Sequence, residues 1–148
     1  VVAASPKVVS HHNIPEPQDA AMAQYSVPFC VALAFYRDPR DPRVFFEESV
    51  SDAKIRALTR KVSVELLDPP RPENEKASRV TVTLKDGRSF TQDLDHFPGM
   101  PQAPLSRAQL REKYDALMAA MPRERSAKLF EQLDALENVE DVSRLTTS

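Results

Sequence analysis

The chain has 148 residues, of which 41% are hydrophobic and 28% charged, a composition typical of a soluble globular protein with its own core. A formal net charge of −2, with acidic and basic residues interspersed, argues against binding to nucleic acid or to an acidic membrane surface. Two glycines exclude a glycine-rich phosphate loop, and a single cysteine, Cys30, excludes an internal disulfide and a multi-cysteine metal site.

No apolar run reaches the roughly 18 residues that a membrane-spanning helix needs, and no signal peptide is expected. We therefore expect a location in the cytoplasm or in an organelle matrix. Cys30 stands among apolar residues, which is typical of a buried, unreactive thiol. The chain begins at Val1, in a strand-like run and without a methionine, so we expect a piece of a longer protein.

The first third of the chain predicts a strand, a loop and a long helix. The apolar run 7–10 predicts the strand, and the two prolines and the asparagine of 11–17 predict the loop. Asp19 is placed to cap a helix from 20 to about 36, which is apolar on every side and therefore buried. Pro28 falls in its middle, which predicts a kink and a freed carbonyl at Gln24.

The middle of the chain predicts a helix followed by three strands. The helix is expected from Ser51 to about 61, and the first strand follows at 62–66, where apolar and polar residues alternate. A charged, proline-rich loop then leads to a second alternating strand at 80–84. A three-residue hairpin loop with Gly87 in a left-handed bulge would pair Phe90 with Val82, which keeps the apolar residues on one face.

The last third predicts two helices. Ser106 and Gln109 have the spacing of a capping box, and Pro122 separates the first helix from a second at about 123–137. That second helix is expected to turn four apolar residues inward, namely Leu129, Phe130, Leu133 and Leu136. The whole chain, 1–148, is thus expected to form a single α+β domain, with a small, mainly antiparallel sheet and helices before and after it.

Few residues could carry chemistry. His11 and His12 are adjacent, so on a strand they would face opposite ways; a solvated or edge-packed pair is the simpler interpretation than a shared metal. His96 stands beside Asp95 in a glycine-containing loop, where it could act as an acid or base or simply belong to a polar loop. Ser26 is not expected to be a nucleophile, because no histidine stands at a characteristic spacing from it and no G-x-S-x-G motif surrounds it. Tyr25 and Phe29 share one helix face, which is more often core than catalytic.

Five stretches, in this order, carry a resemblance to a known family: AQYSVPFCVA (23–32), VTLKDGR (82–88), DHFPG (95–99), PLSRAQLREKY (104–114) and the closing run at 145–147. The first resembles the A-x-F-S-L-P-Y-x-V-A stretch of the MmgE/PrpD family, and the others resemble its hairpin, its G-x-P-x-x-P-L-S run and its closing segment. Members of this family have a large helical domain followed by a smaller α+β domain. This chain resembles the second, smaller domain.

The resemblance implies a lyase or isomerase that removes a proton next to a carboxylate of a small di- or tricarboxylic acid, as in 2-methylcitrate dehydratase. It implies no metal and no organic cofactor, an upstream helical domain as partner, and a homodimer of the full protein. The kinked helix would supply substrate-binding residues, namely Gln24, Ser26 and Phe29. Tyr25 and His96 would be the catalytic candidates, and the fragment alone is expected to be inactive.

One departure concerns Phe29, where the family commonly has a tyrosine. Phenylalanine can neither donate a proton nor bind a carboxylate by a hydrogen bond, so Tyr25, one turn earlier, is the expected source of a hydroxyl. Two alternatives stay open: a non-catalytic α+β module that binds a partner protein, and a family member that has lost activity.

Overall fold

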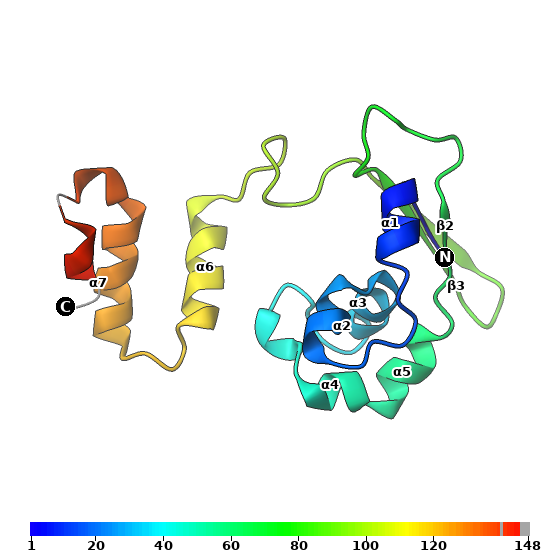
Figure 1. Ribbon diagram of the computed structural model, residues 1–148, viewed down its shortest axis with the longest axis horizontal. Helices are drawn as coiled ribbons and strands as arrows, with labels where there is room; N and C mark the ends of the chain where they lie inside the picture. The colour runs from blue at the N-terminus through cyan, green and yellow to red at the C-terminus, as the bar shows by residue number, and fades with distance from the viewer. Residues whose placement is uncertain (140, 146–148) are drawn as a thin grey trace. The chain divides into compact units, whose positions relative to one another are not determined.

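The computed structural model describes residues 1–139 and 141–145. The closing run at 145–147, which resembles the family's closing segment, lies partly outside the described residues, because Thr146 and Thr147 are not among them. The chain divides into two compact units, 1–103 and 104–148 (Figure 1). The stretch before the division, 95–103, forms no helix or ladder strand and contains Gly99 and two prolines.

The first unit contains a four-stranded sheet in the order β2-β1-β3-β4. Strand β1 pairs parallel to β2 and antiparallel to β3, and β3 pairs antiparallel to β4. The strands are β1 Val2–Ala4, β2 Val64–Leu66, β3 Ser78–Thr83 and β4 Ser89–Leu94. The mainly antiparallel sheet and the surrounding helices confirm the α+β class.

The β3–β4 hairpin has the predicted register. Val82 lies opposite Phe90, and Gly87 takes a φ of 87° in the loop, a conformation that glycine adopts without steric cost. Residues that face each other in a pair share one side of the sheet, so the apolar residues gather on one face. The other face carries polar pairs such as Arg79 with Asp93, whose closest approach is 2.7 Å.

The stretch expected to form the first strand is instead helix α1, Pro6–His11. Pro6 stands in the first turn, where its missing N–H costs nothing and its fixed φ suits a helix. A run of four residues with two valines, Val8 and Val9, did not distinguish a strand from a helical turn. The first strand lies earlier, at Val2–Ala4, and pairs on both sides.

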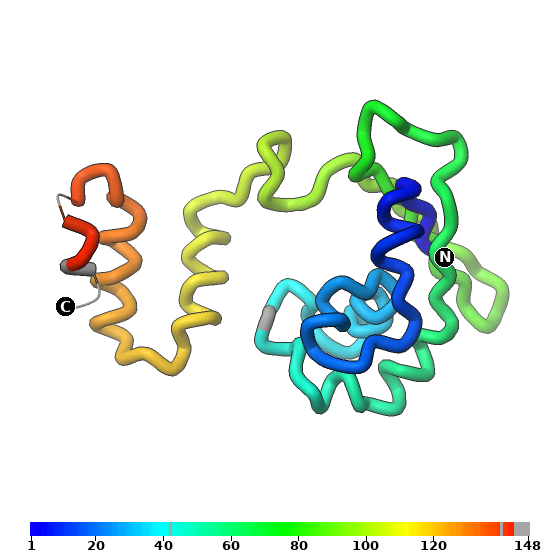
Figure 2. The backbone as a smooth tube through the Cα atoms, in the orientation of Figure 1, coloured from blue at the N-terminus to red at the C-terminus, as the bar shows by residue number. Residues whose placement is uncertain are grey.

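The long helix expected from 20 to 36 is two helices, α2 Ala20–Tyr25 and α3 Val27–Ala34, and the prediction of one kinked helix is wrong (Figure 2). Ser26 has an extended backbone between them and caps α3. Pro28 therefore occupies the first turn of a new helix, where no donor is lost. The expected cap of the first helix is confirmed, because Asp19 accepts a 2.7 Å hydrogen bond from the Met22 N–H.

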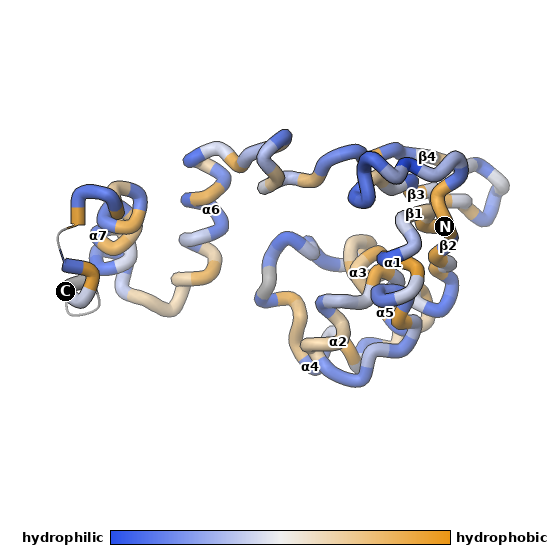
Figure 3. The backbone as a smooth tube through the Cα atoms, turned by 45° about the horizontal axis from the view of Figure 1, so that its top comes forward, coloured by the Kyte–Doolittle hydropathy of each residue, from blue (hydrophilic) through white to orange (hydrophobic). Residues whose placement is uncertain are grey.

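The second expected helix, from Ser51 to about 61, is α5 Ala53–Thr59, and a separate short helix that was not predicted, α4 Glu47–Ser51, precedes it. It does not start at Ser51 because the extended Asp52 separates the two and caps α5 with its side chain. Helices α2 to α5 lie together, and in Figure 1 they form a layer beside the sheet. Their core consists of Ala23, Phe29, Ala32, Leu33, Val50 and Ile55. The hydrophobic colouring of α3 in Figure 3 fits this burial.

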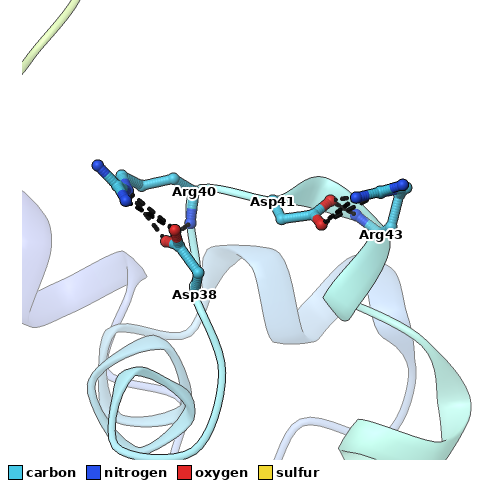
Figure 4. Close-up of polar contacts among 4 residues, drawn as sticks. All are labelled: Asp38, Arg40, Asp41 and Arg43. Atoms are coloured by element: carbon cyan, nitrogen blue, oxygen red, sulfur yellow. Dashed lines mark hydrogen bonds and ion pairs between the residues drawn. The ribbon is translucent and has the colours of Figure 1, made fainter. Parts of the chain in front are cut away.

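The turn after α3 carries two ion pairs between neighbouring residues. Asp38 accepts hydrogen bonds from Arg40, and Asp41 accepts hydrogen bonds from Arg43, each pair forked and 2.7 Å at its closest (Figure 4). The Arg40 guanidinium and backbone N–H lower the pKa of Asp38 to about 2. Such exposed pairs add little stability, so we interpret them as ordering the turn.

The second unit contains α6 Arg107–Leu117 and α7 Arg123–Asp134, followed by two short 3-10 turns, Leu136–Asn138 and Val142–Leu145. Both hydrogen bonds of the predicted capping box at Ser106 are present. Phe130 is 6% exposed and lies against Tyr114 and the Arg111 guanidinium. Leu133 and Leu136 are exposed, at 44% and 45%, contrary to the prediction. Helix α7 ends before Leu136, which places that residue beyond the predicted inward face.

Candidate functional site

The break between α2 and α3 separates the predicted site residues into two groups. Gln24 and Tyr25 end α2 with their side chains exposed, Tyr25 at 64%. Ser26 and Phe29 are fully buried, each at 0%. The expected grouping of all four around a ligand is therefore not what the structure brings together, because α3 starts afresh and turns Phe29 toward the core.

The Ser26 hydroxyl is occupied by the fold. It donates a 2.5 Å hydrogen bond to the carbonyl oxygen of Ile14 and accepts a 3.0 Å bond from the Phe29 N–H. A hydroxyl has one proton to donate, and here the backbone takes it. In this structure Ser26 has no exposed surface for a substrate, and its role is to fix the break.

Phe29 has a structural role as well. Its ring lies 6.4 Å from that of Phe45, tilted by 45°, inside the core shared with α5. Tilted aromatic pairs at this separation stabilise a core beyond the area they bury. A phenylalanine fits this apolar site without the hydroxyl that a tyrosine would have to bury.

The carbonyl of Gln24, expected to be freed by Pro28, faces the Cys30 thiol, with the sulfur 3.8 Å away. The same thiol lies 3.6 Å from the Ala23 carbonyl oxygen. Burial raises the pKa of Cys30 to about 11, so the thiolate is scarce at neutral pH. This agrees with the unreactive thiol expected from its apolar neighbours.

His12 lies beside Tyr25, a contact that the sequence analysis missed. The two rings are 6.1 Å apart between centroids and nearly parallel, at 11°. The Nδ1 atom of His12 is 3.1 Å from the carbonyl oxygen of Tyr25. His12 was expected in a loop, as one of a solvated or edge-packed pair, whereas it is the C-cap of α1 and half-buried. No sequence spacing joins residues 12 and 25, because a loop and a helix separate them.

His96 lies in another part of the first unit, directly after β4. Its neighbour Asp95 forms an ion pair with Arg71 and accepts a 2.9 Å hydrogen bond at its carbonyl from Asn74. The Lys76 ammonium lies 5.5 Å from the centre of the Phe97 ring. The loop around His96 is thus held on both sides while its imidazole is exposed. Within the described residues no hydrogen bond or ring contact joins His96 to Tyr25.

Among residues 1–139 and 141–145, no three His, Cys, Asp or Glu side chains lie close enough to hold a metal ion. None of the helices found there is both long and apolar enough to cross a membrane.

The chain is similar to known proteins over nearly all of its length. Residues 1–138 match the MmgE/PrpD C-terminal domain. A cis-aconitate decarboxylase of Mus musculus is 30% identical over 140 residues, which are 93% of this chain and 29% of the relative. One of Homo sapiens is 30% identical over 141 residues, 94% of this chain and 29% of the relative. The chain thus spans less than a third of these relatives, and it belongs to the MmgE/PrpD family through its C-terminal domain.

Proposed function

We propose that this chain is the cleft-covering domain of a lyase or isomerase that acts on small di- or tricarboxylic acids without a cofactor. The match to the family's C-terminal domain over residues 1–138 carries the proposal. The similarity to two cis-aconitate decarboxylases supports a carboxylic acid as substrate. An upstream helical domain of the same protein is the expected partner and would supply most of the acid and base groups.

The proposed chemistry starts with removal of a proton from the carbon next to a carboxylate. The electron pair left on carbon then expels water as hydroxide, which takes up a proton, as in a 2-methylcitrate dehydratase, or the carbon is reprotonated. In a decarboxylase no proton is removed first: the bond from carbon to a carboxylate breaks, carbon dioxide leaves, and the electron pair of that bond takes up a proton on the carbon skeleton. Each route needs donors where negative charge develops. From this chain, Tyr25 could donate its phenolic proton, and the exposed His96 could exchange one. Gln24, exposed next to Tyr25, could bind the substrate through its side-chain amide.

The buried residues support the site indirectly. Ser26 and Phe29, first expected to contact substrate, would instead hold Tyr25 in place through the capped break. This interpretation also fits the absence of a phenol at position 29, since the hydroxyl would come from Tyr25 one turn earlier. We further propose a cytoplasmic location and a homodimer of the full protein.

The test uses the full-length protein that contains this chain, with cis-aconitate, 2-methylcitrate and citrate as substrates. Absorbance follows the formation or the loss of a double bond in the substrate. Released carbon dioxide is measured separately. Turnover of any of the three supports the proposal, while this chain alone should turn over none. Turnover by the chain alone, or no turnover by a folded full-length protein, would contradict it.

A second candidate is a non-catalytic module, or a relative without activity, that binds a partner protein. It is favoured by exposed aromatic side chains on the helical layer, at Phe35, Tyr36 and Phe46. The presence of Phe29 instead of tyrosine points the same way. The turnover test separates the candidates, because a module without activity binds its partner but leaves all three acids unchanged.

A further inference from the structure

Strand β4 lies at one edge of the sheet, and its backbone is open on the outer side (Figure 3). Thr81 of β3 exchanges both of its backbone hydrogen bonds with Val1, at 2.8 and 2.9 Å. Thr91 lies opposite Thr81, so it turns its own N–H and C=O away from β3. Bonded and non-bonded pairs alternate along an antiparallel ladder, and Ser89 and Asp93 therefore face outward as well.

The two edges of this sheet differ in protection. Strand β2 has only three residues, Val64–Leu66, and Pro69 and Pro70 follow closely. Strand β4 has six residues in unbroken register, without a bulge, a lysine or a proline, and all six are exposed. Phe90 is 57% exposed and Leu94 is 44% exposed. Because folded proteins blunt the edges that they leave unpaired, an edge of this kind indicates a further strand beside β4.

The sequence of β4 is complementary to itself. Phe90 and Leu94 stand two residues before and two residues after Gln92, on the same side of the sheet as Val82. Two antiparallel copies centred on Gln92 place each Phe90 opposite Leu94 of the other copy. In a register centred on Thr91, Phe90 would face the polar Gln92 instead. The first register keeps the apolar residues together, so it favours a second copy of this chain as the further strand.

The polar side of β4 allows the same pairing. The register centred on Gln92 sets Thr91 opposite Asp93 of the second copy, and the backbone groups of both residues face outward. Asp93 keeps the ion pair with Arg79 of its own chain, 2.7 Å at its closest, so its charge is compensated. The exposed Gln92 amide now donates to the Asp93 carbonyl at 2.9 Å. It can turn to its counterpart in the second copy, which frees that carbonyl.

We propose that two copies of this protein pair along β4, so that their four-stranded sheets join into one continuous sheet. Backbone hydrogen bonds between Thr91 and Asp93 on both sides of the axis set the register, and Phe90 packs on Leu94 of the second copy. The inference rests on the homodimer of the proposed function and names its surface. It makes no use of turnover, so the activity and the pairing can fail separately.

A disulfide across the axis tests the pairing in the full-length protein. The two Gln92 positions form a non-hydrogen-bonded pair, with Cα atoms about 4.5 Å apart, so the thiols of Gln92→Cys are within reach of a disulfide. Oxidised glutathione takes the two electrons, and non-reducing gels measure the linked dimer. Ser89→Cys is the matched control on the same exposed strand, because its two thiols would lie about 20 Å apart. The unmodified protein gives the background from Cys30 and other cysteines.

Gln92→Cys should give about tenfold more linked dimer than Ser89→Cys, because only its thiols meet within the pair. Thr91→Pro, added to Gln92→Cys, should lower the linked fraction to background, since it removes an outward N–H and no bond to β3. Thermal unfolding checks that each variant is folded.

Equal linking at positions 92 and 89, or no linking in a folded Gln92→Cys protein, would overturn the inference. So would full linking in the folded double variant. A dimer found by sedimentation of the unmodified protein, but without this link, keeps the proposed homodimer and loses the β4 pairing. Turnover of the carboxylic acids decides the proposed activity independently of both results.

Discussion

The hydroxyl of Ser26 is bound to the carbonyl oxygen of Ile14 at 2.5 Å, and this bond ties the loop before α2 to the break after it. The same oxygen caps α3 through the Phe29 N–H. Ser26 is fully buried, so its hydroxyl is directed to these two backbone groups and not to solvent. The conformation of the break, which leaves Tyr25 exposed, therefore depends in part on this hydroxyl, beside the backbone bond from the Val27 N–H to the His12 carbonyl oxygen.

Ser26→Ala should lower the free energy of unfolding by about 1–2 kcal/mol, the cost of losing a helix cap and the hydrogen bond to the part-buried Ile14 carbonyl. Urea denaturation followed by circular dichroism measures it. Ser51→Ala is the control: its exposed hydroxyl donates to the carbonyls of Glu47 and Glu48 in its own helix, and its loss should change little. An equal effect of both substitutions would remove the special role of Ser26.

Gly87→Ala should destabilise the β3–β4 hairpin by about 1 kcal/mol, because at a φ of 87° a Cβ is unfavourable even where nothing crowds it. Gly87→Asn should cost less, since asparagine tolerates the left-handed region better. Thermal unfolding of the three proteins gives the order glycine, asparagine, alanine. If the Gly87→Ala protein unfolded at the same temperature as the unmodified protein, the loop would not have the bulged conformation.

Asp52 makes stability depend on acid pH. The N–H groups of Lys54 and Ile55 donate to its carboxylate and lower its pKa in the folded protein. A carboxyl with a depressed folded pKa stabilises the fold above its unfolded pKa of about 3.9, and this contribution is lost as the pH falls through the folded value. Asp52→Asn keeps a capping oxygen without the charge, so its urea midpoint should fall less on acidification. Parallel pH curves for both proteins would contradict this assignment.

Phe130 is the centre of the second unit, with Arg111 and Tyr114 against its ring. Phe130→Ala should cost about 3 kcal/mol or more, as for other buried aromatic residues, and should speed hydrogen exchange in α6 and α7. Leu133→Ala, at a side chain that is 44% exposed, should cost less than about 1 kcal/mol. Similar exchange rates in the two variants would mean that Phe130 is not the core of this unit.

Local rules predicted the parts of the fold that depend on neighbouring residues. Alternation and strand parity predicted that Val82 faces Phe90, and spacing predicted the Ser106–Gln109 capping box. The same rules failed where one residue could be interpreted in two ways. Pro28 indicated a kink within a helix, but it lies in the first turn of α3 because Ser26 stops α2 and caps the next helix.

The candidate site was only partly accessible to such rules. The family pattern pointed to Gln24 and Tyr25, which the structure leaves exposed. The burial of Phe29 depends on how α2 to α5 pack together, and the contact between His12 and Tyr25 depends on how the end of α1 meets the end of α2. Packing between helices leaves no pattern in the spacing of residues along the sequence. The expectation of a strand at 7–10, where the structure has α1, also hid the contact between His12 and Tyr25.

The most direct measurement is the turnover of the full-length protein with and without the Tyr25 hydroxyl. Tyr25→Phe should lower kcat/KM about 100-fold on the best of the carboxylic acids, as expected for loss of a proton donor. Tyr36→Phe, at another exposed tyrosine, should leave it unchanged. If Tyr25→Phe turns over substrate as fast as the unmodified protein, the exposed end of α2 is not part of the active site.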